Sequence, residues 1–514
     1  SLNYVRTFAR KHHLDVLAAY EIESYQTDHA SGEKSKLPSD KLTEPDNAAV
    51  LNSFKSATQA YRMISYLSRL NYDYDDRYYI AGSYRRDGSS RLSPNNRWGN
   101  FWSVSGMWHL GNENFMKAVK PVLSDVKIRA SYGVNGNQPG SYYGYKGLYS
   151  YGENYMEAAG SYESSQPNDL LTWEKNYSLN LGIDLSFINR IFASLEYYNR
   201  DTKDLLYSLP ISATTGFTSY LSNIGRLNNK GIEFELRTLN VVSNDFNWTS
   251  VFNLSHNRNK IVSLNGLLDQ TIEGTWFIHK VGLPYHTFYV KEFAGVDPQT
   301  GYAQYYLNTK NEDGSYNREL TTDADKAESI PYKTATPKVS GGFTNILNYK
   351  WIDLTFTLTY SLGGYSFDKL GTYIENGTSS IYSSRYNLPA YMMNRWQNPG
   401  DEKHTNIPAV IGRYEPYYFT YNEHWSQTSY YNVQPFASSL WNMYDYSDLR
   451  VVSGNYLKCN NLMVTYEFGE RILSQLRMTR LALSLSGTNL FTISSKKLKG
   501  QTPTQGFTEV SLSD

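Results

Sequence analysis

Residues 176–187 read NYSLNLGIDLSF, and this stretch decides the fold. From Tyr177 to Phe187 every second residue is apolar, and the residues between them are Ser, Asn, Gly or Asp. Successive side chains of a β-strand point to opposite faces, so the stretch predicts a strand with one apolar and one polar face. The alternation exceeds the roughly 5–6 residues of a soluble strand and reaches the about 9–11 that cross a bilayer at a tilt.

The same alternation recurs along the chain. Residues 352–362 read IDLTFTLTYSL, and residues 126–135 read VKIRASYGVN. We count about 14 such strands, which lies within the range of outer-membrane barrels. The sequence therefore predicts an all-β fold, a large antiparallel transmembrane β-barrel.

The connections between these strands alternate in length. One set is short, at 75–76, 188–190, 239–245 and 348–350, and the other is long and polar, at 86–100, 135–172, 201–228, 257–337 and 363–454. Short periplasmic turns and long extracellular loops are the expected asymmetry of an outer-membrane barrel, whereas a soluble β-sandwich has no reason to sort its loops in this way. Short helical turns are expected only at 113–119 and 470–476.

The composition fits a membrane barrel without proving one. The chain holds 47 Tyr, 10 Trp and 21 Phe, and Tyr and Trp suit the interface between lipid and water. A soluble β-sandwich that binds glycans could be equally rich in Tyr. No run approaches the roughly 20 apolar residues of a membrane-spanning helix. The formal net charge is zero, which gives no indication of a nucleic-acid partner, and the single cysteine, Cys459, excludes an intrachain disulfide.

A series of motifs carries a family resemblance. They read, in chain order, YRRDGSSRL at 84–92, NNRWG at 95–99, FWSVS at 101–105, KIRASYG at 127–133, GNQ at 136–138, WEK at 173–175, NNKGIE at 228–233, FAGVDPQTG at 293–301, RWQNPG at 395–400 and GTNLF at 487–491. In kind and order they resemble the SusC/RagA-type TonB-dependent receptors, which are outer-membrane importers of Bacteroidota.

The resemblance implies a barrel of 22 strands, of which residues 1–514 would form a part that is incomplete at both ends. The plug domain, the TonB-contacting segment and the signal peptide of the family would lie outside this chain. The implied partners are a SusD-like surface lipoprotein, the TonB-ExbB-ExbD complex and outer-membrane lipid. The implied function is active import of oligosaccharides, with oligopeptides as the close second. A passive porin or a structural barrel is the alternative of another class.

Two groups of residues are candidates for the binding site. Aromatic residues of the long loops could stack on sugar rings or peptide side chains: Tyr142, Tyr143, Tyr145, Tyr149, Trp276, Tyr285, Tyr417, Tyr418, Trp425 and Trp441. Loop packing or lipoprotein contact is the competing interpretation for each. The charged residues of the YRRDGSSRL motif, Arg85, Arg86, Asp87 and Arg91, are expected to form a network that orders the loop at the rim, with direct ligand contact as the lesser alternative.

Catalysis finds no support in the sequence. Glu233 and Glu235 share one face of a strand beside Arg237, and a charged lumen wall explains them better than a glycosidase pair. The chain lacks G-x-S-x-G, H-E-x-x-H and P-loop motifs. Adjacent His12 and His13 would point to opposite faces of a strand and could not bind one metal together. We therefore expect no enzyme activity, no cofactor and no metal site.

Overall fold

The computed structural model describes residues 1–156, 158–264, 270–273, 276–368, 389–409, 420–421, 427–428, 447–498, 501 and 503. Within these residues the chain forms two compact units. Unit 1 comprises residues 1–189, 194–230 and 262–265, and unit 2 comprises residues 190–193, 231–261 and 266–514. No helix among the described residues is both long and apolar enough to cross a membrane.

One sheet of fourteen strands dominates the structure and confirms the predicted all-β fold. In spatial order it contains β1 (Leu2–Phe8), β2 (His12–Ser35), β3 (Val50–Tyr74), β4 (Tyr78–Ser89), β5 (Trp98–Trp108), β6 (Leu123–Asn137), β9 (Glu174–Phe187), β10 (Ile191–Lys203), β13 (Arg226–Val242), β14 (Phe246–Ser263), β22 (Val339–Tyr349), β23 (Ile352–Leu362), β28 (Tyr456–Glu467) and β29 (Ala482–Ser494). Spatial order follows chain order, and neighbours such as β2 and β3 or β22 and β23 run antiparallel.

Strand β3 shows the apolar and the polar face that the alternation predicts. On β3 the even-numbered residues Tyr66, Leu70 and Tyr74 lie on the apolar face, where 43% of the Leu70 surface is exposed. The odd-numbered residues, among them Arg69 and Asp73, lie on the polar face. Large apolar side chains that remain exposed on a sheet require an apolar solvent, and a bilayer supplies it.

Aromatic side chains gather at both ends of the apolar face of unit 1. At one end His12, Tyr74, Tyr78 and Trp108 form a row with ring centroids 4.9, 6.4 and 6.3 Å apart. At the other end Tyr20, Tyr66 and Trp98 follow one another at 5.2 and 6.3 Å. Two aromatic girdles that flank an apolar band are the signature of an outer-membrane barrel.

The chain reverses tightly at one end of the strands, which we call the turn end. Between β3 and β4, Asp75 and Asp76 both adopt positive φ, +53° and +51°, and the Arg77 N–H donates to the Tyr74 carbonyl over 3.0 Å. This pattern matches a type I′ turn, the two-residue connection whose twist fits antiparallel strands. Ile188 and Asn189 reverse the chain after β9 with the same signs of φ.

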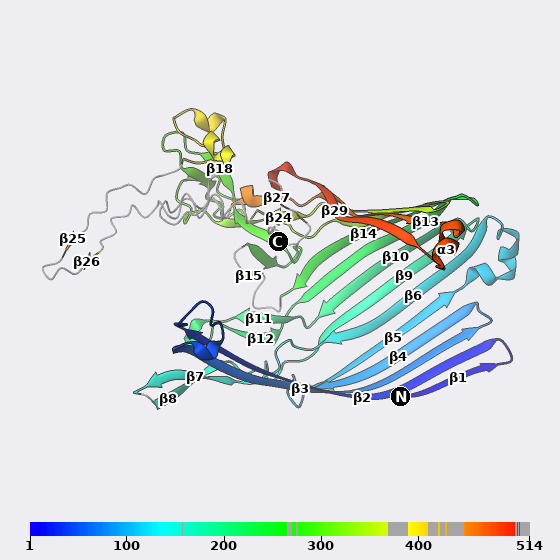
Figure 1. Cartoon of the computed structure of the whole chain (residues 1–514). Helices are drawn as coiled ribbons and strands as arrows, with labels where there is room; N and C mark the ends of the chain where they lie inside the picture. Colours follow the sequence, from blue (N-terminus) through cyan, green and yellow to red (C-terminus); the bar gives the residue numbers. More distant parts are fainter. Residues whose placement is uncertain are drawn as a thin grey trace. The chain divides into compact units, whose positions relative to one another are not determined.

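The opposite end, which we call the loop end, carries the long connections (Figure 1). They are partly ordered into small sheets that the alternation did not predict. Unit 1 has two such sheets: β7 (Leu148–Tyr155) with β8 (Ala158–Ser165), and β11 (Leu206–Pro210) with β12 (Ser219–Asn223). In unit 2 one sheet has four strands, β15 (Gln270–Glu273), β16 (Phe277–Lys280), β17 (Thr287–Lys291) and β21 (Ser329–Thr334), and another has three, β18 (Phe293–Val296), β19 (Ala303–Tyr306) and β20 (Leu320–Thr321). Two further sheets of unit 2 are strand pairs: β24 (Tyr365–Phe367) with β27 (Val451–Ser453), and β25 (Thr420–Tyr421) with β26 (Gln427–Thr428).

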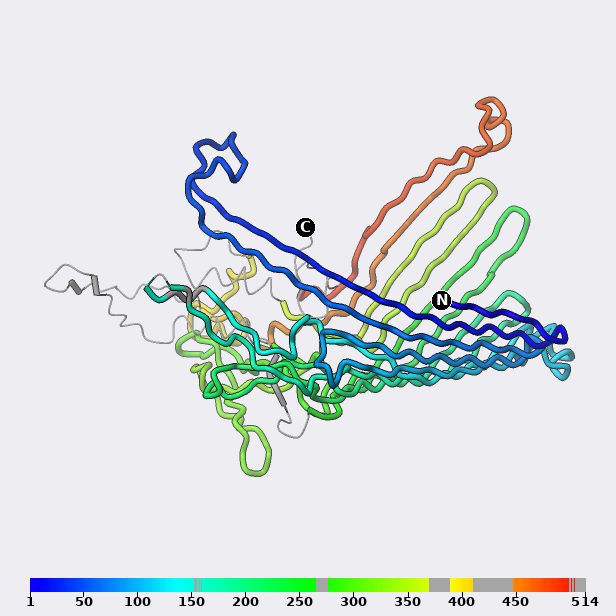
Figure 2. The backbone as a smooth tube through the Cα atoms, turned by 90° about the horizontal axis from the view of Figure 1, so that it is seen from below, coloured from blue at the N-terminus to red at the C-terminus, as the bar shows by residue number. Residues whose placement is uncertain are grey.

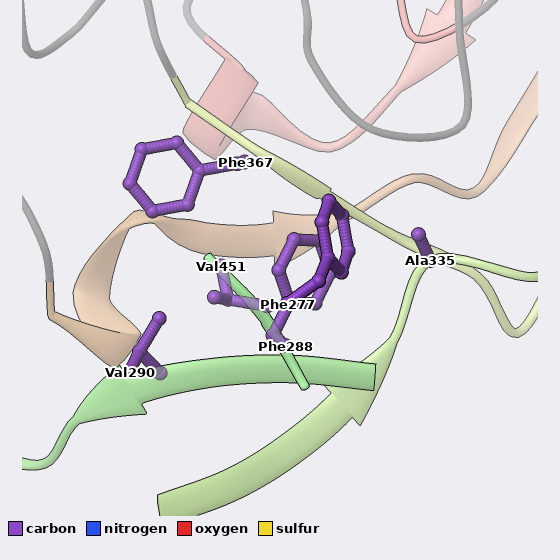
Figure 3. Packing of buried hydrophobic residues seen from close by; sticks show 6 residues of the cluster. All are labelled: Phe277, Phe288, Val290, Ala335, Phe367 and Val451. Atoms are coloured by element: carbon purple, nitrogen blue, oxygen red, sulfur yellow. The ribbon is translucent and has the colours of Figure 1, made fainter. Parts of the chain in front are cut away.

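The buried apolar clusters of the described residues lie mostly in these loops rather than between strands of the large sheet. In unit 2, Phe277 and Phe288 stack at 4.9 Å and are surrounded by Val290, Ala335, Phe367 and Val451 (Figure 3). Two further clusters centre on Tyr305 in unit 2 and on Leu92 in unit 1, both with no exposed surface. The loops therefore have hydrophobic cores of their own.

Strands β2 and β3 are longer than the sequence predicts. Their register runs without interruption from His12 opposite Tyr74 to Glu33 opposite Ser53, whereas β4 pairs with β3 only from Met63 onward. The outer half of this hairpin thus continues past its neighbour, as the dark blue tube in Figure 2 shows. Prediction also placed a turn at 239–245, but β13 continues through Val242 and the connection is 243–245.

The two short helical turns are confirmed. A 3₁₀ helix, η3 (Asn114–Ala118), and the helix α3 (Glu470–Leu476) lie in turn-end connections.

The GTNLF motif forms a β-bulge between β28 and β29. Cys459 lies opposite Phe491 and Asn461 lies opposite Thr488, so one residue of β28 and two of β29 are looped out. One of the latter, Asn489, has a φ of +55°, a conformation that Asn tolerates better than most residues. The bulge keeps Cys459 and Leu462 on the same face, opposite Leu358 and Phe356 of β23.

We predict that Leu70→Lys destabilises the full-length protein by about 2–4 kcal/mol, because Leu70 lies midway between the two girdles of β3 and a lysine there must enter the apolar band. The matched control is Leu67→Lys, the same change on the polar face of the same strand. Denaturant titration of protein refolded into lipid vesicles measures both. Equal losses for the two variants would contradict the assignment of faces.

Candidate functional site

The polar face of unit 1 carries a charge network near the loop end, built on the YRRDGSSRL motif. Arg85 Nε donates to both oxygens of Asp87 over 2.7 and 2.9 Å. Its Nη2 donates to Ser65 Oγ over 2.9 Å and lies 3.5 Å from Glu21 Oε2. Asp87 and Ser65 are buried, so the network joins β2, β3 and β4. Arg85 and Asp87 thus form a charge network, and its role in ordering the loop at the rim stays a prediction.

Arg86 points to the opposite face from Arg85. Its guanidinium lies 5.0 Å from the centre of the Trp98 ring, in the girdle at the loop end. A cation over an aromatic face is attracted by the ring quadrupole, and this contact anchors the girdle. Gly88 is required nearby, because a Cβ there would lie 2.8 Å from the Trp98 ring. Arg86 therefore belongs to the girdle and not to the rim network.

Arg91 holds the next loop in place. Its guanidinium lies 4.0 Å from the ring of Tyr61 and 4.4 Å from that of Tyr142, and its Nη1 donates to the carbonyls of Pro139 and Gly140 over 3.0 and 3.3 Å. Tyr61 and Tyr142 are themselves stacked at 5.5 Å. The contact fastens the loop after β6 to β3.

The loop aromatics of unit 1 divide into packed and exposed residues. Tyr143 Oη accepts a hydrogen bond of 3.1 Å from the Ala60 N–H, and Tyr145 packs against the cluster around Leu92. With Tyr142 under Arg91, these three predicted residues are occupied by loop packing. Among the predicted residues of unit 1, Tyr149 stands apart, with 60% of its surface exposed.

Tyr149 has exposed aromatic neighbours that the sequence did not single out. Tyr151 and Tyr155 of β7 and Tyr162 of β8 are exposed to 78, 75 and 53%. No spacing rule distinguishes them from packed tyrosines of the same loop, because exposure depends on how the β7–β8 hairpin projects. We call Tyr149, Tyr151, Tyr155 and Tyr162 the hairpin tyrosines.

The two predicted aromatics of unit 2 that the structure describes, Trp276 and Tyr285, are packed. Trp276 stacks on Phe367 at 4.5 Å. Tyr285 stacks on His279 at 4.1 Å and meets His286 edge-on at 4.9 Å. Burial, with a smaller contribution from His286, lowers the pKa of His279 to about 4, and burial also lowers the pKa of His286. Tyr417, Tyr418, Trp425 and Trp441 lie outside the described residues.

Two motifs of unit 2 meet in one loop contact. Asp297 accepts hydrogen bonds from the backbone N–H groups of Gln299 and Thr300 over 3.0 and 2.7 Å, which closes the DPQTG turn. Gly301 ends this turn with a φ of +71°, and a Cβ on it would lie 2.2 Å from the Trp396 ring of the RWQNPG motif. Both motifs therefore serve loop structure.

We call the polar face of the large sheet the polar wall, and in unit 1 this wall contains a cavity. A cavity of about 580 Å³ is lined by Arg6, His13, Asp15, Asn71, Asp73 and Arg129, among others. Arg129 pairs with Asp184 and Glu196 at 3.1 and 2.6 Å, so its charge is compensated on the wall. In unit 2, Glu233, Glu235 and Arg237 are exposed on β13, as expected for a polar wall.

Long two-faced strands, aromatic girdles, a polar wall and loops gathered at one end define a transmembrane β-barrel of the outer membrane. The family model described as TonB dependent receptor-like, beta-barrel matches residues 20–316. The chain belongs to this family, and its type is that of SusC and RagA. It thus lies in the outer membrane, with its turn end periplasmic and its loop end extracellular.

Individual relatives support this assignment. TonB-dependent receptor P3 of Formosa agariphila is 29% identical over 96% of this chain and 47% of its own length. TonB-dependent receptor SusC of Bacteroides thetaiotaomicron is 33% identical over 69% of this chain and 37% of its own. The RagAB peptide importer in its closed-closed state superposes with a TM-score of 0.81 and 26% identity, over 99% of this chain and 53% of that chain. The chain thus spans about half the length of such relatives, and they are named as receptors or transporters rather than enzymes.

We predict that Arg91→Ala loosens the segment 139–146 by about 1–3 kcal/mol, because it removes two cation–π contacts and two charged hydrogen bonds. Hydrogen exchange of that segment in the full-length protein measures the change. Arg86→Ala is the control, since it removes a cation–π contact on the other face of β4. Unchanged protection at 139–146 in Arg91→Ala would refute the anchoring role.

We also predict that acid loosens the loop around β16. The pKa of His279 is about 4 in the folded chain against 6.5 for a free imidazole, so the unfolded form takes up the proton first. The stabilisation is complete above about pH 6.5 and is lost as the pH falls toward about 4. Exchange protection of β16, corrected for intrinsic rates, should fall over this range, and it should fall less in His279→Phe, where only the buried His286 remains to take up a proton. The exposed His404→Phe should behave like the unmodified protein.

Proposed function

We propose that this chain forms the barrel wall and extracellular loops of an importer for oligosaccharides. The observation that carries the proposal is the set of hairpin tyrosines at the extracellular end. Exposed tyrosine rings offer apolar faces with a hydroxyl at the edge, which suits the alternating apolar and polar surface of a sugar ring. Loops are also where binding residues of a rigid scaffold gather.

The polar wall supports a passage for a hydrophilic substrate. Arg129 pairs with Asp184 and Glu196, and Arg69 lies 3.4 Å from Asp15, so the wall carries charges of both signs. Charged and polar side chains along the wall hold water in the passage. A large neutral solute such as an oligosaccharide would meet no electrostatic barrier along it.

The proposed partners follow from the family. A SusD-like lipoprotein would cover the extracellular loops and hold the substrate over them. The TonB-ExbB-ExbD complex would supply the energy for import. In this arrangement the hairpin tyrosines would face either the substrate or the lipoprotein.

Oligopeptides are the second candidate substrate. The RagAB structure, which is named a peptide importer, resembles 99% of this chain. Tyrosine rings and a neutral polar wall accept peptides as well as sugars, so the two substrate classes require a functional comparison.

Growth of the source bacterium with and without the gene tests the proposal. We predict that deletion abolishes growth on one complex glycan and leaves growth on its monosaccharide intact. Loss of growth on oligopeptides alone would favour the second candidate. Uptake that persists without TonB would indicate a passive porin and contradict the proposal.

The hairpin tyrosines are tested in the full-length protein with its lipoprotein partner. Each stacked ring contributes about 0.5–1.5 kcal/mol, so Tyr149→Ala with Tyr151→Ala should weaken binding of the glycan about 5- to 150-fold. Tyr349→Ala, the same change at the turn end of β22, is the control. Unchanged affinity in the double variant, with the lipoprotein still bound, would remove these residues from the site.

A further inference from the structure

Three side chains of metal-binding type meet at the turn end of unit 1. One ring nitrogen of His13 and one carboxylate oxygen each of Asp73 and Asp76 lie within 4.8 Å of one another. This is the one such group of three or more among the residues that the structure describes. His13 and Asp73 also line the cavity in the polar wall.

Strand register and turn geometry bring the three together. His13 of β2 lies directly opposite Asp73 of β3, and both side chains point to the polar face. Asp76 is the second central residue of the type I′ turn, with a φ of +51°, and its carboxylate lies within 4.8 Å of the ligand atoms of His13 and Asp73. His12 points the other way, with its Nδ1 2.8 Å from Tyr72 Oη. The sequence correctly separated the two histidines but could not reveal the partners of His13.

Asp73 and Asp76 lack the cationic partners that the adjacent Asp75 has, although Tyr79 Oη donates a long hydrogen bond of 3.5 Å to Asp76 Oδ1. Asp75 pairs with Lys11 at 3.4 Å and with Arg77 at 3.1 Å. Within the described part of the chain, neither Asp73 nor Asp76 forms an ion pair. Asp73 Oδ1 is inaccessible to solvent and accepts no hydrogen bond from any described residue. A buried carboxylate oxygen without a partner is costly, and a bound cation would relieve that cost.

His13 is oriented as a metal ligand would be. Thr7 Oγ1 of β1 lies 2.9 Å from its Nδ1. When Nδ1 carries the proton and donates to this hydroxyl, Nε2 keeps its lone pair for a metal. A hydrogen bond to the second ring nitrogen is the usual support of a metal-binding histidine.

We propose that His13, Asp73 and Asp76 bind a divalent first-row transition metal ion of the zinc type. One imidazole nitrogen with two carboxylate oxygens suits such ions, whereas calcium and magnesium prefer oxygen ligands alone. Bonds of about 2.0–2.2 Å require the three atoms to approach by small side-chain rotations. The ion leaves at least one coordination position for water, and it ties β2 to the β3–β4 turn at the periplasmic rim.

Zinc binding to the full-length protein in detergent, stripped of metal with chelator, tests this site. Calorimetric titration with Zn²⁺ should show one saturable site per chain. Loss of an outer-shell partner typically lowers metal affinity about 10- to 100-fold, and Thr7→Val should lower the Zn²⁺ affinity within this range. Loss of a ligand should lower the Zn²⁺ affinity further, in each of the variants Asp73→Asn, Asp76→Asn and His13→Gln. Substituted Co²⁺ should give visible absorption that the ligand variants lose.

Asp75→Asn is the matched control, because it alters the adjacent carboxylate that already has cationic partners. It should bind Zn²⁺ like the unmodified protein. Heat-modifiable migration on gels shows whether each variant is folded. If a ligand variant does not fold, Thr7→Val still tests the site, because it changes the hydrogen-bond partner of His13 and no ligand. Absence of saturable binding, equal binding in Asp73→Asn, or equal weakening in Asp75→Asn would each overturn the proposal.

Discussion

A peptide group in lipid has no water to bind, so each N–H and C=O must find a partner in a neighbouring strand. This constraint explains the length and regularity of the large sheet, whose strands pair along nearly all of their residues. It also explains why irregular backbone is confined to the two ends. With hydrogen bonding satisfied by pairing, the side chains are free to differ on the two faces. The alternation of Tyr177 to Phe187 is the visible result.

The same constraint explains why the hydrophobic cores lie mostly in the loops and not against the large sheet. On the large sheet, apolar residues such as Ile22 and Leu485 remain 62% and 78% exposed, since lipid is their solvent. The loops at the other end lie in water and must bury their own apolar residues, and Phe288 and Tyr305 are fully buried there. Several motifs that mark the family serve these loop cores and the rim. Gly301 against Trp396 and Arg91 between two tyrosines are examples.

Much of this could be predicted from sequence because period-two alternation is a local signal. Strand type, loop sorting and the turn at Asp75 and Asp76 all follow from neighbouring residues. Binding residues are different, because their environment depends on distant segments. Tyr142 and Tyr151 are alike in sequence context, yet one is covered by Arg91 and the other is exposed. Arg85 and Arg86 belong to one motif, yet alternation places them on opposite faces, and they contact Asp87 and Trp98 respectively.

The bulge at Asn489 bears on how the family can change in length. One residue added within a paired strand would move every later side chain to the opposite face of the sheet, unless the added residue is looped out in a bulge. β28 and β29 carry such looped-out residues, and the faces remain in phase on either side of them. Insertions and deletions in related barrels should therefore fall in the loops or coincide with a bulge. This is consistent with the RagAB structure, which is 26% identical to this chain and still superposes on 99% of it.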